Sequence, residues 1–64
     1  MIEVTVVETG DNATAATPED ALFAALTLGR EAREHRGIWG FDPTIRFEVA
    51  GEIVRVVSLR SLTR

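Results

Sequence analysis

The segment 52–59, Glu-Ile-Val-Arg-Val-Val-Ser-Leu, is rich in β-branched residues and is predicted to form a strand with apolar side chains on both faces. Because side chains alternate along a strand, Val54 and Val56 lie on one side, and Ile53 and Val57 lie on the other. A chain of 64 residues with one expected helix can cover one sheet face and not both. The second face therefore predicts association with another copy or with another protein.

The composition leaves association as the main additional source of stability. A chain of this length is near the lower limit for folding unaided. It has no cysteine and one histidine, so disulfides and a thiolate metal site are excluded. We therefore expect a homo-oligomer, and a dimer in particular.

The charge balance argues against several partners. The net charge is −3, and all seven basic residues are arginine. No excess of positive charge would attract nucleic acid or an anionic membrane, so we expect neither as a partner. The N-terminus has no basic lead followed by an apolar run, and no segment reaches the roughly 20 apolar residues of a membrane span. The expected location is the cytoplasm.

The order of apolar patterns predicts one α+β domain over residues 1–64. Alternation indicates strands at 2–8 and 45–49, in addition to 52–59, and the small polar residues between Gly10 and Thr17 indicate a loop. With a helix after that loop, the element order is β-α-β-β. A crossover through the helix makes the first two strands parallel, so the last strand is expected between them. The prediction is a three-stranded antiparallel sheet, order 1-3-2, with one helix packed on one face.

The helix has clear start and stop signals. Thr17 can cap its N-terminus, Pro18 suits the first helical position, and Gly37 suits a left-handed stop after about Arg36. Gly29 lies in the centre of the apolar stripe, where it predicts close approach of the helix to the sheet.

The sheet faces then follow from alternation. The first, second and third strands would place Ile2, Val4, Val6, Phe47, Val49, Val54 and Val56 against the helix. The opposite face would carry four aliphatic residues mixed with charged ones. From that face we predict a self-association interface made of Val7, Arg46, Ile53, Arg55, Val57 and Leu59.

The residues that could support catalysis are few. Neither serine lies in a strand-turn-helix elbow, and there is no glycine-rich phosphate loop before a helix. Glu31 and His35 have the i, i+4 spacing of metal ligands, but an exposed ion pair fits a helix with no second histidine better. We expect no enzyme activity, no metal and no bound cofactor.

The connection 37–44 contains three large apolar side chains where polar residues are usual. One interpretation is a core plug, in which Ile38 and Phe41 close the open end of the helix–sheet layer. The other is a display of Trp39 between two glycines as a contact residue. Trp39 and Phe41, with Phe23 on the more polar side of the helix, are the candidate residues for contact with a partner or ligand.

The β-α-β-β order, the chain length and a tryptophan just after the helix resemble the dodecins, which are small flavin-binding proteins that form hollow twelve-subunit shells. The resemblance implies a flavin-binding oligomer in which Trp39 stacks on the flavin ring. The chain departs from it by the additional Gly-Phe-Asp-Pro after Trp39.

Two hypotheses result from the sequence. The first is a non-enzymatic, self-associating interaction or adaptor module, such as a bacterial or phage accessory protein that binds a host or cellular protein. The alternative is the small-ligand (flavin) binding oligomer that the resemblance implies.

Overall fold

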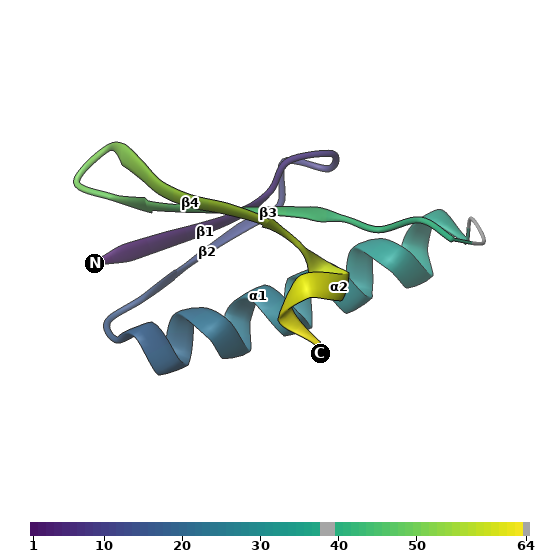
Figure 1. Cartoon of the computed structure of the whole chain (residues 1–64), viewed down its shortest axis with the longest axis horizontal. Helices are drawn as coiled ribbons and strands as arrows, with labels where there is room; N and C mark the ends of the chain where they lie inside the picture. The colour runs from purple at the N-terminus through teal and green to yellow at the C-terminus, as the bar shows by residue number, and fades with distance from the viewer. Residues whose placement is uncertain (38–39, 64) are drawn as a thin grey trace.

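A computed structural model describes residues 1–37 and 40–63 as a four-stranded antiparallel sheet with a long helix packed on one face (Figure 1). A second, short helix follows the last strand. The elements are β1 (Ile2–Val6), β2 (Asn12–Ala15), α1 (Pro18–Arg36), β3 (Thr44–Val49), β4 (Glu52–Ser58) and α2 (Leu59–Leu62). The α+β class, the antiparallel sheet and the packed helix agree with the sequence-based prediction.

The number of strands was predicted wrongly, because β2 lies in the segment that was expected to be a loop. Its sequence, Asn-Ala-Thr-Ala, has neither the β-branched nor the aromatic enrichment that usually marks a strand. The strand forms because β1 turns back on itself: Gly10 has a φ of 79°, and the Val6 N–H donates to Asp11 O at 2.8 Å. Tertiary pairing, with Ile2 opposite Ala15, therefore overrides local propensity.

The additional strand changes the strand order from the predicted 1-3-2 to β2-β1-β3-β4. The crossover through α1 starts from β2 and not from β1, so β3 is free to pair directly with β1 in antiparallel orientation. The strand that was expected at the centre of the sheet, β4, consequently lies on an edge and pairs with β3 alone.

The helix boundaries confirm the sequence signals. Thr17 is the N-cap, and its side chain accepts a hydrogen bond from the Asp20 N–H at 3.1 Å. Gly37 ends the helix in the left-handed region, with a φ of 61°. The residues of α1 that are buried are all small: Ala21, Ala25, Gly29 and Ala32.

A bulge in β4 inverts the predicted alternation beyond it. Phe47 pairs with Arg55 and Glu48 pairs with Ile53, so Val54 has no partner of its own in β3. Val57 then pairs with Ile45 and packs against the core, whereas Val56 pairs with Arg46 and lies on the outer face. The predicted placements of Val56 on the inner face and of Arg55 and Val57 on the outer face are therefore wrong.

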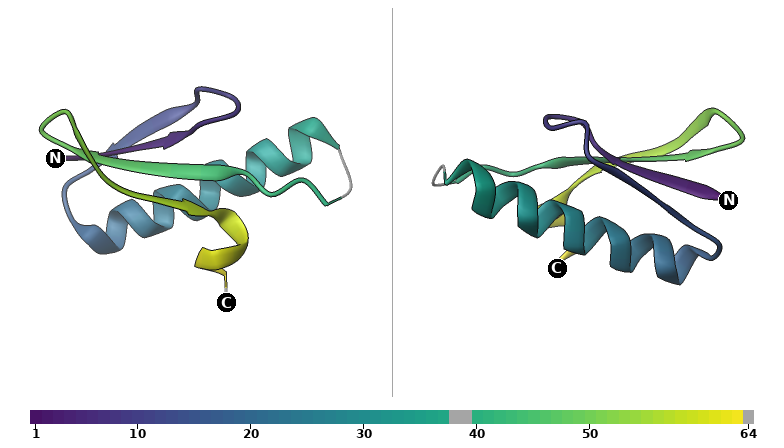
Figure 2. Two further views of the ribbon diagram at one scale, coloured as in Figure 1. Left: turned by 45° about the horizontal axis from the view of Figure 1, so that its top comes forward. Right: turned by 180° about the vertical axis from the view of Figure 1, so that it is seen from behind.

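Leu59 was predicted on the outer face and is instead fully buried as the first residue of α2. The short helix is held at its start by the Asp42 carboxylate, which accepts from the Arg60 N–H at 2.9 Å. The Pro43 carbonyl accepts from the Leu59 N–H at 2.8 Å. This anchoring turns the chain away from the sheet and brings α2 beside α1, as the two views of Figure 2 show.

Candidate interaction surfaces: the β4 edge and the adjoining groove

The strand β4 is exposed over most of its length. Every residue from Glu52 to Val56 is exposed, although three of these five are aliphatic. Ile53 is 59%, Val54 60% and Val56 53% exposed. An edge strand presents unpaired backbone N–H and C=O groups, and apolar side chains on it favour pairing with another chain.

The opposite edge of the sheet has different properties. β2 has four residues, and the side chains that it exposes, Asn12 and Thr14, are small and polar. Part of β2 packs under α1. A short, polar and partly covered edge is the usual protected form, so the two edges of this sheet are not equivalent.

The outer face of the sheet is more polar than predicted. Arg46 Nε lies 2.7 Å from Glu48 Oε1, so two of its charged side chains form an ion pair with each other. Glu48 stands directly opposite Glu3 in the register of β1 and β3, and Arg46 offsets that like-charge contact. The exposed aliphatic residues on this face, Ile53 and Val56, are both in β4.

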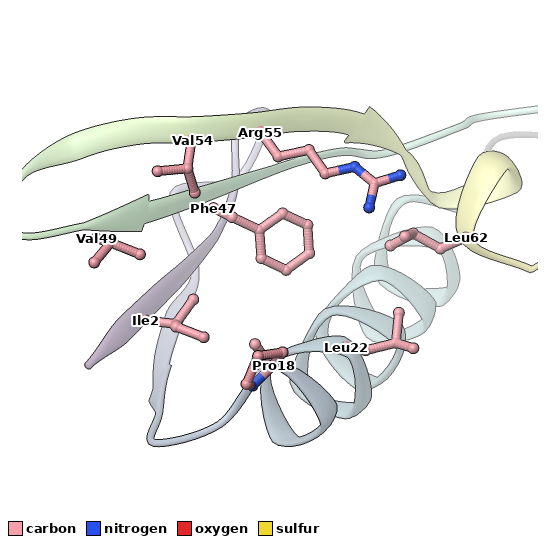
Figure 3. A pocket seen from close by; sticks show the side chains of 9 residues that line it. Ile2, Pro18, Leu22, Phe47, Val49, Val54, Arg55 and Leu62 are labelled. Atoms are coloured by element: carbon pink, nitrogen blue, oxygen red, sulfur yellow. The ribbon is translucent and has the colours of Figure 1, made fainter.

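A groove of about 350 Å³ adjoins β4 on the inner side of the sheet (Figure 3). The sheet contributes Ile2, Phe47, Val49, Val54 and Arg55. The helices contribute Pro18, Ala21, Leu22 and Leu62. The Phe47 ring points from β3 toward α1, and the Arg55 side chain extends from β4 toward Leu62.

The groove is open because α1 covers only part of the sheet. Its buried alanines let it pack closely on β1 and β2, and it packs little against β3. Leu22, at the margin of that stripe, remains 43% exposed, and Val49 remains 39% exposed. The apolar surface left over in this chain therefore lies along β4 and in the groove, and less on the outer face.

The predicted interface residues lie in several different environments. Ile53 and Arg55 belong to the β4 edge, and Val7, which is 47% exposed, lies in the turn after β1. Arg46 is half-buried and paired with Glu48. Val57 and Leu59 are directed into the chain's own core region, as described above.

The candidate contact residues for a partner or ligand also lie in different environments. Phe41 is half-buried against the core, and the Arg36 guanidinium lies 5.1 Å from the centre of its ring, which agrees with the core-plug interpretation for this residue. Phe23 is 73% exposed on α1. Ile38 and Trp39 lie outside the described residues.

The Glu8 carboxylate has a lowered pKa. Partial desolvation alone would raise the pKa of its carboxylate, but hydrogen bonds outweigh that effect and lower it. The Thr44 N–H donates to Oε1 and the Thr44 hydroxyl donates to Oε2, each at 2.8 Å. Arg36, which donates to the Glu8 carbonyl at 3.1 Å, adds a favourable charge. The cluster connects the turn after β1, the end of α1 and the start of β3, and its position suits a structural role.

The described residues contain no cluster of three or more histidine, cysteine or acidic side chains arranged to hold a metal ion. No helix in residues 1–37 and 40–63 has the length and apolar character of a membrane span.

Comparison of the chain with protein-family models, with curated proteins and with solved structures finds no match. The β-α-β-β order that carried the dodecin resemblance is wrong, because the structure has two strands before α1 and a helix after β4. The flavin hypothesis rests on Trp39, which lies outside the described residues, and it stays a prediction.

Sequence reasoning missed the groove. Pro18 was interpreted as part of a helix start, and neither Leu22 nor Leu62 was predicted as a site residue. One signal was present in the sequence: the α1 stripe contains Ala21, Ala25 and Ala32, and such small residues can cover only the strands that they touch closely.

Proposed function

We propose that this chain is a non-enzymatic self-associating module that forms a homodimer by antiparallel pairing of β4 with β4 of a second copy. The single observation that carries the proposal is the exposure of residues 52–56 on an unpaired edge. Pairing of the two edges would give one continuous eight-stranded sheet and would satisfy the backbone groups on both strands.

A second copy suits this edge because β4 is complementary to itself in charge. Its two charged residues, Glu52 and Arg55, have opposite signs, and both lie on the inner face, opposite Val49 and Phe47. Antiparallel overlap of two β4 strands brings Glu52 of each copy toward Arg55 of the other. Two-fold symmetry makes each such contact twice.

Two features of β4 oppose pairing. A bulge at Val54 and a charged side chain at Arg55 are both devices that discourage edge association. The three aliphatic side chains of β4, each more than half exposed, favour pairing. Covering what remains exposed of Ile53, Val54 and Val56 would contribute about 3–5 kcal/mol per subunit, before the cost of association. We therefore expect a dimer of moderate affinity, in the micromolar range.

The test is the mass in solution as a function of concentration. Sedimentation equilibrium should move from the 7.0 kDa of the single chain toward twice that value as concentration rises from low micromolar to millimolar. Amide exchange should slow in β4 over the same range and stay constant in β2. A single 7.0 kDa species at millimolar concentration, with the fold intact by circular dichroism, contradicts the proposal.

A further inference from the structure

The groove beside β4 is a separate feature from the β4 edge. Edge pairing uses the backbone of β4, whereas the groove opens on the inner side of the sheet, between the hairpin β3–β4 and the first turns of α1 (Figure 3). Its volume of about 350 Å³ falls at the low end of the range for small-molecule sites, about 300–1,000 Å³. That volume suits a single alkyl chain better than a peptide helix.

The described residues that line the groove are apolar, apart from one that is charged. Phe47 forms its floor, and Leu22, Val49, Val54 and Leu62 stand around it, all as carbon surface. Among the described residues that line the groove, Arg55 is the only charged one. In the described part of the chain, the Arg55 guanidinium makes no ion pair with any side chain. The ion pair in this part joins Arg46 and Glu48.

An apolar cleft with a few polar groups at fixed positions is the usual form of a small-ligand site. Here the polar group is a guanidinium, which binds a carboxylate through two parallel N–H donors. The aliphatic part of the Arg55 side chain lies over the groove, so its charge sits at the rim toward Leu62. A matching ligand has an unbranched apolar chain and one anionic end.

We propose that the groove binds an amphiphilic monocarboxylate, with the alkyl chain against Phe47 and Leu22 and the carboxylate on Arg55. The site does not require the β4 dimer, because each copy carries a complete groove. Edge pairing would bring Glu52 of the other copy toward Arg55, so binding is tested at low micromolar protein concentration, where the single chain is expected to predominate. Binding by the single chain therefore fails or succeeds independently of dimerisation.

The test is calorimetric titration of the full chain with saturated fatty acids of eight, ten and twelve carbons, each below its micelle concentration. Because each buried methylene contributes about 0.8 kcal/mol, affinity should rise about fourfold per added methylene. Dodecan-1-ol serves as the uncharged probe. Amide shifts in a nuclear magnetic resonance titration should concentrate on residues of β3, β4 and the first turns of α1.

The substitution that isolates the charge is Arg55→Gln. It should weaken dodecanoate binding about tenfold, as expected for loss of a charge-assisted hydrogen bond, and leave dodecan-1-ol binding unchanged. Arg30→Gln, an exposed arginine of α1 that does not line the groove, is the matched control and should change neither. Three results overturn the proposal: no saturable binding of dodecanoate, an affinity that ignores chain length, or equal losses with Arg55→Gln and Arg30→Gln.

Discussion

Gly29 of α1 and Leu59 of α2 are in such close contact that a Cβ placed on Gly29 would lie 2.7 Å from Leu59 Cδ1. Leu59 is fully buried, so it has little space to move away. The sequence predicted a close approach at Gly29, and the approach is real, but the neighbour is the C-terminal helix and not the sheet.

The first prediction follows from this contact. Gly29→Ala should gain about 1 kcal/mol in helix propensity and lose about 1–3 kcal/mol through overpacking against Leu59. We expect a net loss of about 1 kcal/mol in the free energy of unfolding, measured by urea denaturation.

Leu59→Ala provides the second half of a double-mutant cycle. Alone it should cost about 2–5 kcal/mol, because it removes a buried leucine. In that background Gly29→Ala should become stabilising, since the helix gain stays and the steric conflict disappears. If Gly29→Ala lowers the stability equally in both backgrounds, the contact with Leu59 is not the reason why alanine is unfavourable at position 29.

The helix could be predicted from the sequence because its signals are local. Thr17, Pro18 and Gly37 each act through the backbone next to them, and all three have the expected roles. The hairpin turn at Ala50 and Gly51 was predictable for the same reason. The sheet order was not, because it depends on β2, whose strand state comes from pairing with β1 and not from its own residues.

The candidate site was partly predictable. Surplus apolar surface on β4 follows from its composition, and Ile53 is exposed as expected. Which face each residue occupies beyond Val54 depends on a one-residue bulge, and alternation from sequence cannot locate a bulge. The groove depends on how far α1 reaches across the sheet, which only the complete packing determines.

The lowered pKa of Glu8 predicts a pH-dependent contribution to stability. A carboxylate whose pKa is depressed in the folded state adds stability above its unfolded value, near 4.5, and this stability is lost as pH falls through the folded-state pKa. Glu8 is exposed and solvent screens its interactions, so Glu8→Gln should cost at most about 1 kcal/mol at pH 7.

The measurement for Glu8 is urea denaturation of both proteins from pH 7 to pH 3. The gap between wild type and Glu8→Gln should be constant near neutrality and close below pH 4.5. Glu34→Gln, which also removes one exposed carboxylate of the chain, controls for net charge. A gap that persists unchanged at pH 3 would mean that Glu8 acts through its shape and not through its charge.

The β3–β4 turn offers a stabilising substitution. Ala50 has a φ of 53° and Gly51 a φ of 81°, so both turn residues lie in the left-handed region. For an L-residue with a Cβ, the left-handed conformation costs about 1–2 kcal/mol of conformational free energy. Asn-Gly is the preferred sequence of such hairpin turns. Ala50→Asn should raise the melting temperature, with a gain of about 1 kcal/mol. Ala16→Asn, at an exposed alanine without a positive φ, should give no gain.

The last prediction separates the β4 edge from the outer face as the surface of self-association. Ile53→Lys places a charge on the paired edge, where antiparallel overlap would bring two such charges close together and desolvate them. We expect it to weaken dimerisation by at least about tenfold in sedimentation equilibrium, with little change in monomer stability because Ile53 is 59% exposed.

The control variant, Val7→Lys, makes the same chemical change at a residue 47% exposed in the turn after β1. Edge pairing leaves Val7 uncovered, so this variant should dimerise like wild type. If Val7→Lys dissociates the dimer as strongly as Ile53→Lys, the contact surface includes the far end of the sheet, and stacking of outer faces replaces edge pairing.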